Sequence, residues 1–411
     1  MLKLKRLTIH KHPRVRPGTE LVFNDGFNVL LGVNGSGKTT LLELLVQVLN
    51  GRFESLAEHE FHLSYLCEGV GARCSVDVRS SPGSLQKDPQ ARPLVSWTMQ
   101  LDLHGGERIT IAGEHDRVVT TYKGKTTTSV QPTDFDFPLS AVASGQLREL
   151  DSDNGELQAR IHEFSTWNLA RFDEATRWFD DGIAASEFVF FELGKGRIEP
   201  AIDDFLPPIV GRALADQARL GEQHDDFKLD DRQVEFLDQT CKALGFTSAM
   251  MQLELLRREQ LDEPDAWSWY LGQLRFRFVK EDGTRLRHDQ LSFGQRRLFA
   301  FLYYAAIHRA VIVADELTNG LHHAMIRLCL DVIGGRQAFL ATQNPLLLDN
   351  LAFESAEEVR RTFILCATER EGGRERMVWR NMSIDEAENF YRDYKVGISH
   401  VNDILRSWGL W

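Results

Sequence analysis

A glycine-rich stretch near the N-terminus has the spacing of a phosphate-binding loop. Residues 32–39 read Gly-Val-Asn-Gly-Ser-Gly-Lys-Thr and match G-x-x-x-x-G-K-[ST] at every fixed position. Apolar residues 27–31 before it predict a buried strand, and residues 40–49 after it predict a helix that ends at Asn50-Gly51. The glycines let successive backbone N–H groups face one anion, and the helix adds its positive N-terminal end. A chance glycine-rich turn would not need both flanking elements, so we expect a nucleoside triphosphate site.

Each residue type in this loop has a chemical task. Lys38 would reach the β- and γ-phosphates, and the Thr39 hydroxyl would ligate Mg²⁺. We therefore expect ATP and Mg²⁺ as the ligands. The residues expected to hold the nucleotide are Asn34, Gly35, Ser36, Gly37, Lys38, Thr39 and Thr40.

A second group of residues that could do chemistry lies late in the chain. Residues 291–295, Leu-Ser-Phe-Gly-Gln, open an apolar helix that runs to about His308. The apolar run 310–314 then ends in Asp315 and Glu316. Such a run predicts a buried parallel strand with two carboxylates at its carboxyl end, where open α/β sheets place ligands. Asp315 can hold Mg²⁺ through its water shell, and Glu316 can orient or deprotonate the attacking water.

The order of these motifs resembles the ATP-binding-cassette ATPase family, in particular its soluble RecF-like, SMC-head-like and OLD-like branch. An N-terminal strand pair, residues 2–9 and 20–23, leads directly into the phosphate loop. Residues 317–322 are similar to the segment that follows the family's Asp-Glu pair, and residues 339–345 resemble its switch segment. The resemblance implies an α/β fold: an ABC-type P-loop ATPase head with an N-terminal antiparallel β layer and an inserted compact helical lobe.

The resemblance also implies roles for single residues. Ser292, Gly294 and Gln295 match the signature that closes the γ-phosphate held by a second subunit, so ATP would be sandwiched in a homodimer or higher homo-oligomer. Gln343 stands where the family has a switch histidine; glutamine can donate a hydrogen bond but cannot carry charge, which implies slow hydrolysis or a conformational switch. Gln146 stands where members place a Mg²⁺-sensing glutamine, and an ordinary surface glutamine is the alternative.

Composition limits the class of protein. The chain has 411 residues, 43% of them apolar, and no run approaches the ~20 apolar residues of a membrane span. The N-terminus reads as a strand and not as a signal peptide. Five cysteines without a C-x-x-C pair support neither a cysteine zinc site nor a disulfide framework. We expect a reduced, cytoplasmic protein without a membrane segment.

The net charge of −12 weighs against a surface that follows nucleic-acid backbones. Two basic clusters nevertheless occur. They comprise Lys3, Lys5, Arg6, Lys11, His12, Arg14 and Arg16 in the first, and Arg285, Arg287, His288, Arg296 and Arg297 in the second. A solvated face, a mouth for the nucleotide's own phosphates or adenine, and a DNA track are all open uses.

The central region changes pattern partway along. Alternating apolar residues in 74–78 and 95–103, with turns at 104–106 and 122–125, predict an antiparallel β layer. From about residue 147 the spacing is helical, which is shown by Leu157, Ile161, Phe164 and Leu169 and again by Val234, Leu237, Cys241 and Leu244. We interpret this part as a compact helical lobe and a docking surface.

The C-terminal part predicts further elements. They are strands at 363–366 and 377–379, and a helix from Ser383 to about Tyr394 with Glu386 completing a capping box. Two terminal tryptophans, at 408 and 411, pack back on the domain or join a subunit contact. The expected division is 1–146 (first ATPase half), 147–270 (helical lobe) and 271–411 (second ATPase half).

Three functions compete. The first is a regulatory ATPase that controls a separate effector protein, a nuclease or toxin, as in bacterial anti-phage systems resembling the PARIS, Septu and OLD-like groups. No acidic TOPRIM cluster or H-N-H pattern is visible after residue 350, so such an effector would be another chain. The second is a RecF-like repair ATPase that acts directly on DNA, and the third is a transporter cassette. The first is favoured, so DNA binding is possible but not favoured.

Overall fold

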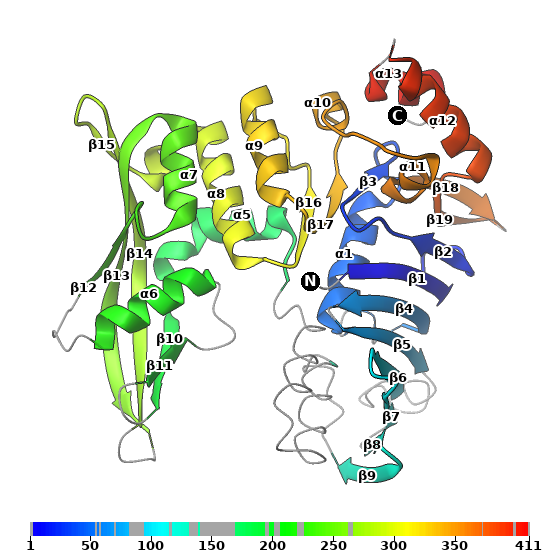
Figure 1. The fold of residues 1–411 in the computed structure, drawn as a ribbon, viewed down its shortest axis with the longest axis horizontal. Coiled ribbons are helices and arrows are strands. Elements are labelled where there is room, and N and C mark those ends of the chain that lie inside the picture. Colours follow the sequence, from blue (N-terminus) through cyan, green and yellow to red (C-terminus); the bar gives the residue numbers. More distant parts are fainter. Residues whose placement is uncertain are drawn as a thin grey trace. The chain divides into compact units, whose positions relative to one another are not determined.

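The computed structural model describes residues 3–53, 56, 59–69, 71–81, 94–114, 117–130, 139, 169–193, 197–200, 206–219, 226–261, 266–371, 373–397 and 400–409. The chain divides into two compact units, drawn in Figure 1. The first unit combines Met1–Arg171, Ala310–Glu316 and Gly335–Trp411, and the second combines Phe172–Arg309 and Leu317–Gly334. The second unit therefore takes segments of 271–411 that the sequence had grouped with the second ATPase half.

A five-stranded sheet forms one layer of the first unit, with strand order β16-β17-β3-β18-β19. Its strands are β3 (Phe27–Leu31), β16 (Val311–Asp315), β17 (Gln337–Ala341), β18 (Phe363–Glu371) and β19 (Arg374–Asn381). The first four strands in this order are parallel, and β19 returns antiparallel to β18. All of β17 and nearly all of β3 and β16 are buried, which explains their mainly apolar sequences.

Helix α1 (Lys38–Asn50) follows β3 and buries its leucines in the core of the first unit. The helix ends at Gly51, whose left-handed backbone (φ 63°) closes the last turn. The expected strand–loop–helix order is confirmed, and the helix begins two residues earlier than the apolar pattern indicated.

An eight-stranded antiparallel sheet, order β2-β1-β4-β5-β6-β7-β8-β9, forms the other layer of the first unit. Its strands are β1 (Lys3–Lys11), β2 (Thr19–Val22), β4 (Phe61–Gly69), β5 (Ala72–Ser81), β6 (Leu94–Leu103), β7 (Arg108–Glu114), β8 (Arg117–Tyr122) and β9 (Lys125–Val130). One face belongs to the same hydrophobic cluster as α1, and the other is polar, as the alternating sequences require. The expected antiparallel β layer and both its hairpin turns are confirmed.

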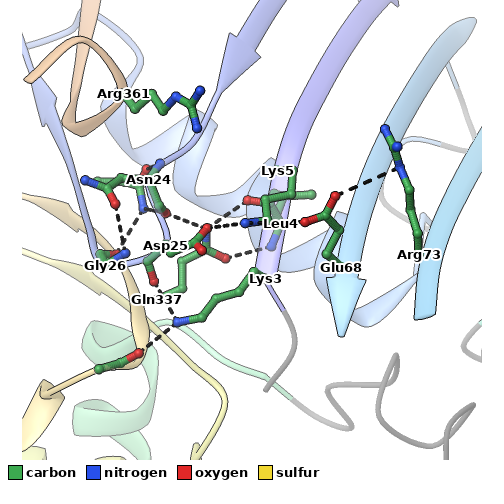
Figure 2. Close-up of polar contacts among 12 residues, drawn as sticks. Lys3, Leu4, Lys5, Asn24, Asp25, Gly26, Glu68, Arg73, Gln337 and Arg361 are labelled. Carbon is green, nitrogen blue, oxygen red and sulfur yellow. Dashed lines mark hydrogen bonds and ion pairs between the residues drawn. The ribbon is translucent and has the colours of Figure 1, made fainter. Parts of the chain in front are cut away.

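The first residue of β17, Gln337, joins the two layers. Its amide carbonyl accepts a hydrogen bond from the Leu4 N–H, and its amide nitrogen donates to the carbonyls of Leu4 and Asn24, each at 2.8 Å. Figure 2 shows this group together with Lys3, which donates to the Asp25 carbonyl at 2.6 Å. Because Gln337 is fully buried, it satisfies backbone groups that water cannot reach.

The C-terminal segment adds four helices to the first unit. They are α10 (Pro345–Leu348), α11 (Ala356–Thr362), α12 (Ile384–Val396) and α13 (Val401–Ser407). The predicted capping box is confirmed, since Ser383 and Glu386 exchange both of its hydrogen bonds. The Trp408 ring lies 6.3 Å from the Phe390 ring, so this tryptophan packs back on its own chain.

The second unit is built on a six-stranded antiparallel sheet of order β11-β10-β14-β13-β12, with β15 paired to β14. The strands are β10 (Phe188–Leu193), β11 (Arg197–Pro200), β12 (Asp226–Asp230), β13 (Phe246–Gln260), β14 (Ala266–Lys280) and β15 (Arg285–Arg287). The helices are α5 (Phe172–Asp181), α6 (Pro208–Arg219), α7 (Glu235–Leu244), α8 (Phe293–Ile307) and α9 (His323–Ile333). Rings of Phe179, Phe236, Phe276, Phe299 and Tyr303 pack edge to face or stack in its core.

The α/β fold class is confirmed, but the expected helical lobe over 147–270 needs correction. Its described part contains α5, α6 and α7, yet strands β10 to β14 form its main element. Buried Phe188 and Phe190 alternate with more exposed neighbours, as do Met251 and Leu253 within β13. This period of two predicts strands, whereas the helical spacing correctly predicts only α7; Leu157, Ile161 and Phe164 lie outside the described residues. None of the described helices is long and apolar enough to cross a membrane.

Candidate nucleotide-binding site

The phosphate loop connects the buried end of β3 to the N-terminus of α1. Its glycines adopt positive φ angles: Gly32 at 150°, Gly35 at 82° and Gly37, the N-cap of α1, at 85°. Only glycine takes these conformations without strain. The loop therefore presents the first N–H groups of a 13-residue helix together with the helix dipole.

Neighbouring strands hold this loop in shape. A Cβ on Gly32 would lie 2.2 Å from the Cys366 carbonyl oxygen of β18, and one on Gly37 would lie 2.5 Å from the Met377 sulfur of β19. The Thr368 hydroxyl also donates to the Gly35 carbonyl at 3.4 Å. No local sequence pattern predicts this role for β18 and β19, because these contacts join residues more than 300 positions apart.

Lys38 and Ser36 fit a phosphate ligand. The Lys38 ammonium folds over its own loop and donates to the carbonyls of Gly32 (2.7 Å) and Val33 (3.1 Å). The Ser36 hydroxyl is buried and has no hydrogen-bond partner among the described residues. A cation held by loop carbonyls and an unsatisfied buried hydroxyl are groups that a bound phosphate would engage. The residues present therefore fit a nucleoside triphosphate.

The expected metal ligands of the loop and of β16 are in direct contact. The Thr39 hydroxyl donates to the Asp315 carboxylate at 2.6 Å. Asp315 is the last residue of β16, and Glu316 follows it with a left-handed backbone (φ 50°), which is uncommon for a non-glycine residue. The Glu316 N–H donates to the Ala341 carbonyl at 2.8 Å, so the strained turn is fixed at the end of β17. Hydroxyl and carboxylate oxygens are the ligands that Mg²⁺ prefers.

The switch segment reaches the same loop. Gln343 follows β17, and its amide donates to the Asn34 side-chain carbonyl at 2.5 Å. Asn344 accepts the Leu346 N–H and so caps α10, and its own N–H donates to the Thr342 hydroxyl. The structure therefore gathers Gln343, Asn34, Thr39, Asp315 and Glu316 around the ends of three adjacent strands. Gln146, the other expected metal-sensing residue, lies outside the described residues.

The signature residues form the start of α8 in the second unit. Ser292 is the N-cap of this helix and shares a capping box with Gln295, whose side chain accepts the Ser292 N–H at 3.1 Å. A Cβ on Gly294 would lie 2.5 Å from the Gly320 carbonyl oxygen, so the first helical turn lies directly against the turn that follows Leu317. Phe293 is exposed. The N-terminus of α8 is thus a capped helix end, in which Gln295 serves the cap and the helix dipole favours negative charge.

A cavity of about 230 Å³ adjoins the first turns of α1. Its lining includes His12, Arg14, Thr40, Glu43 and Gln47. Backbone hydrogen bonds of Arg14 and Arg16 with Met377 fix residues 12–16 beside β19. Burial, followed by the charges of His59 and Arg14, lowers the pKa of His12 to about 4, so its ring is neutral near pH 7. The cavity therefore lies beside the helix that follows the phosphate loop.

Two family models match the sequence. One, described as "AAA domain, putative AbiEii toxin, Type IV TA system", matches residues 151–349, and the other, described as "AAA domain", matches residues 2–176. Together these ranges contain the phosphate loop, the signature and the Asp315-Glu316 pair. The matches support an ABC-type P-loop ATPase.

Solved structures of SMC head domains match this chain over most of its length. A head bound to the C-winged helix domain of ScpA is 14% identical, with 92% of this chain and 98% of that chain covered and a TM-score of 0.40. A head from Pyrococcus furiosus with an extended coiled coil, bound to the C-terminal domain of ScpA, is 12% identical, with 96% and 100% covered and a TM-score of 0.36. One from Thermotoga maritima is 12% identical, with 93% and 99% covered and a TM-score of 0.35. No curated protein matches the sequence.

Proposed function

We propose that this chain is an ATP-hydrolysing regulatory ATPase that dimerises through ATP and controls a separate effector protein in bacterial anti-phage defence. The proposal of ATP hydrolysis rests on two hydrogen bonds. The Thr39 hydroxyl donates to the Asp315 carboxylate, and the Gln343 amide donates to the Asn34 side chain. These bonds join the phosphate loop to the ends of β16 and β17, where a metal and an attacking water are needed.

Substrate binding rests on the loop. The backbone N–H groups of residues 34–39 and the Lys38 ammonium would hold the β- and γ-phosphates, with Lys38 leaving the carbonyls of Gly32 and Val33. Thr39 and Asp315 would hold a Mg²⁺ ion, which supplies charge neutralisation at the phosphates when bound. The cavity beside His12 would accept the base.

Hydrolysis rests on Glu316. In our proposal its carboxylate accepts a proton from water as the water oxygen bonds to the γ-phosphorus and the bond to the β-phosphate bridging oxygen breaks. The backbone bond to Ala341 fixes the turn that aims this carboxylate. Gln343 can donate a hydrogen bond to the γ-phosphate but cannot supply a charge, which fits slow turnover.

Dimerisation rests on the N-terminus of α8. The capped end at Ser292, with Gly294 held against Gly320, would meet the γ-phosphate bound by a second copy of the chain. Loss of the γ-phosphate would remove this bridge and release the second units of both copies. Hydrolysis of the bound ATP would thereby change the arrangement of the two copies in the dimer.

The effector role has two supports. The family model that matches 151–349 carries the name of a putative toxin of a type IV toxin–antitoxin system, and this description supports a role beside a toxin or another effector. Several cations of the basic clusters are also paired with carboxylates: Lys11 with Glu60 at 2.5 Å, Arg296 with Asp180 at 3.1 Å and Arg287 with Asp289 at 2.5 Å. Paired side chains offer little to a DNA backbone, so the RecF-like alternative, in which the chain acts directly on DNA, is second.

ATP turnover and assembly, measured together, test this function. Purified wild-type protein should hydrolyse ATP slowly and form an ATP-dependent dimer in light scattering, and Lys38→Ala should lose both. A wild-type chain that binds ATP yet stays monomeric at every nucleotide state would refute the dimerisation step. Activity equal to wild type in Lys38→Ala would refute the site.

A further inference from the structure

Three side chains on the polar face of the eight-stranded sheet come together on adjacent strands. His10 lies on β1, His62 on β4 and Asp77 on β5, and one potential ligand atom from each lies within 4.8 Å of the others. A register shift between Ile9 and Lys11 brings His10 beside the His62 position. The group lies on the solvent side of strands whose other face is core, so the scaffold is rigid.

The hydrogen bonds in this cluster orient all three groups. The His10 and His62 rings stack with centroids 4.3 Å apart, and His62 Nε2 lies 3.0 Å from Asp77 Oδ2. The Ser64 hydroxyl donates to the same carboxylate oxygen at 2.6 Å and lies 2.9 Å from His10 Nε2. Partial burial raises the pKa of Asp77, but hydrogen bonds from Ser64 and His62 outweigh this, so the net pKa is lowered and the carboxylate is ionised.

We propose that His10, His62 and Asp77 bind a divalent transition-metal ion, with zinc as the preferred ion. Two imidazoles and one carboxylate are a zinc ligand set, and bonds of about 2.0 Å require ligand atoms about 3.3 Å apart. The His62–Asp77 pair already has this spacing, and the exposed His10 ring needs to approach by at most about 1.5 Å. Ser64 is then a positioning residue, because its hydroxyl donates a hydrogen bond to the Asp77 carboxylate.

The surroundings leave room for the remaining coordination positions. A cavity of about 550 Å³ opens beside the cluster, lined by both histidines together with Glu60, Arg79 and Glu114. Water from this cavity would complete the metal's shell. The three residues are not part of the phosphate loop. No sequence motif predicts the site, because its ligands come from three strands that are brought together only by folding.

Zinc binding by the full-length, tag-free protein tests the proposal. After chelator treatment, calorimetry with zinc chloride in ATP-free buffer should show one zinc per chain and a raised melting temperature. His10→Ala and His62→Ala should each lower the affinity at least about 10-fold, and Ser64→Ala should lower it less. Cobalt substitution should give a visible absorption band in wild type that both histidine variants lose.

The controls separate this site from others. His104→Ala, which removes an exposed histidine at the β6–β7 turn, should bind zinc like wild type, and Lys38→Ala should keep the zinc site while losing ATP. All five cysteines are buried, so they do not compete for the ion in the folded protein. Equal zinc affinity in wild type and in the folded double variant His10→Ala/His62→Ala overturns the proposal, as does an absence of zinc binding by folded wild type.

Discussion

At the scale of single residues, the strained backbone of Glu316 positions the carboxylate that we propose activates water. Its φ of 50° is held by a backbone bond to Ala341, so the fold keeps the side chain at the end of β16 against a conformational penalty. Such strain is retained where a side chain must be aimed. The neighbouring Thr39–Asp315 bond fixes the adjacent ligands in the same way.

We expect Glu316→Gln to abolish ATP hydrolysis while leaving ATP binding intact. The amide keeps the volume of the side chain but cannot accept the proton of water, so the rate should fall at least about 100-fold and the assembled form should accumulate. Phosphate release and light scattering measure both effects. The same change at exposed Glu375 serves as control, and hydrolysis at the wild-type rate in Glu316→Gln would remove the residue from the mechanism.

Protonation of His12 should lower the stability of the folded chain at acidic pH. The folded pKa of about 4 lies below the ordinary value of about 6.5, and the Arg14 N–H donates to His12 Nδ1, which protonation would prevent. As the pH falls, His12 in the unfolded chain therefore binds a proton at a higher pH than His12 in the folded chain. The stability that the neutral ring contributes is full above pH 6.5 and is lost as the pH falls toward 4. This amounts to at most about 3 kcal/mol.

Urea unfolding of wild type and His12→Asn from pH 7 to 4.5 measures this contribution. Asparagine offers an oxygen near the Nδ1 position and does not titrate, so the variant should lose less stability on acidification. Other titrating groups are common to both proteins and cancel in the difference. Parallel curves for the two proteins would show that His12 is not the sensor.

At the scale of elements, the N-terminus of α8 and the start of β17 have opposite roles. The α8 end is capped and partly exposed, and in our proposal it meets a second copy of the chain. The β17 start is buried and serves only to join two sheets. Backbone groups are hydrogen-bonded at both places. At α8 the cap leaves the helix end accessible, whereas at β17 the Gln337 side chain fixes the strand to β1.

Ser292→Arg should leave ATP binding to the monomer nearly unchanged and block ATP-dependent dimerisation. A long cation at this N-terminus opposes the helix dipole and fills the seat of the γ-phosphate. Ser383→Arg is a matched control, because Ser383 is also the N-cap of a helix with a capping box. If Ser292→Arg dimerised with ATP as wild type does, the signature would not form a composite site.

Gln337→Leu should lower the free energy of unfolding by about 3 kcal/mol, because it leaves the buried N–H and C=O of Leu4 without their partner. Thermal and urea unfolding measure the loss, and Gln239→Leu on the surface of α7 is the control. ATP affinity of the folded variant should stay unchanged, since Gln337 lies at the opposite end of β17 from Gln343. A stability equal to wild type would mean that the two sheets do not depend on this side chain.

At the scale of the whole molecule, charge decides which partners are accessible. The net charge is −12, and several cations of the basic clusters are already paired with carboxylates of the same chain. A negative surface repels a phosphate backbone unless a local positive track outweighs it. In our proposal the second unit, with its antiparallel sheet and helices, therefore meets a protein partner and not a DNA duplex.

We expect only weak binding of duplex DNA by the chain alone at physiological salt. Fluorescence anisotropy with duplexes of increasing length measures it, and capture from the native host should recover a specific protein that requires residues 150–270. Tight, length-dependent DNA binding that is lost when Lys11, Arg14 and Arg16 are neutralised would place the RecF-like function first.

The sequence by itself determined the local elements: the glycine loop between β3 and α1, the strand that ends at Asp315 before Glu316, the helix capped at Ser383 and the hairpins of the β layer. These elements depend on residue types that recur within a few positions, because local backbone preferences act over that distance. Only the tertiary structure decided that β18 and β19 support the loop, that strands β10 to β14 pair in one sheet, and that His10, His62 and Asp77 meet. Such contacts join residues far apart in the chain, and strand pairing, which is set by the shared core, selects their partners.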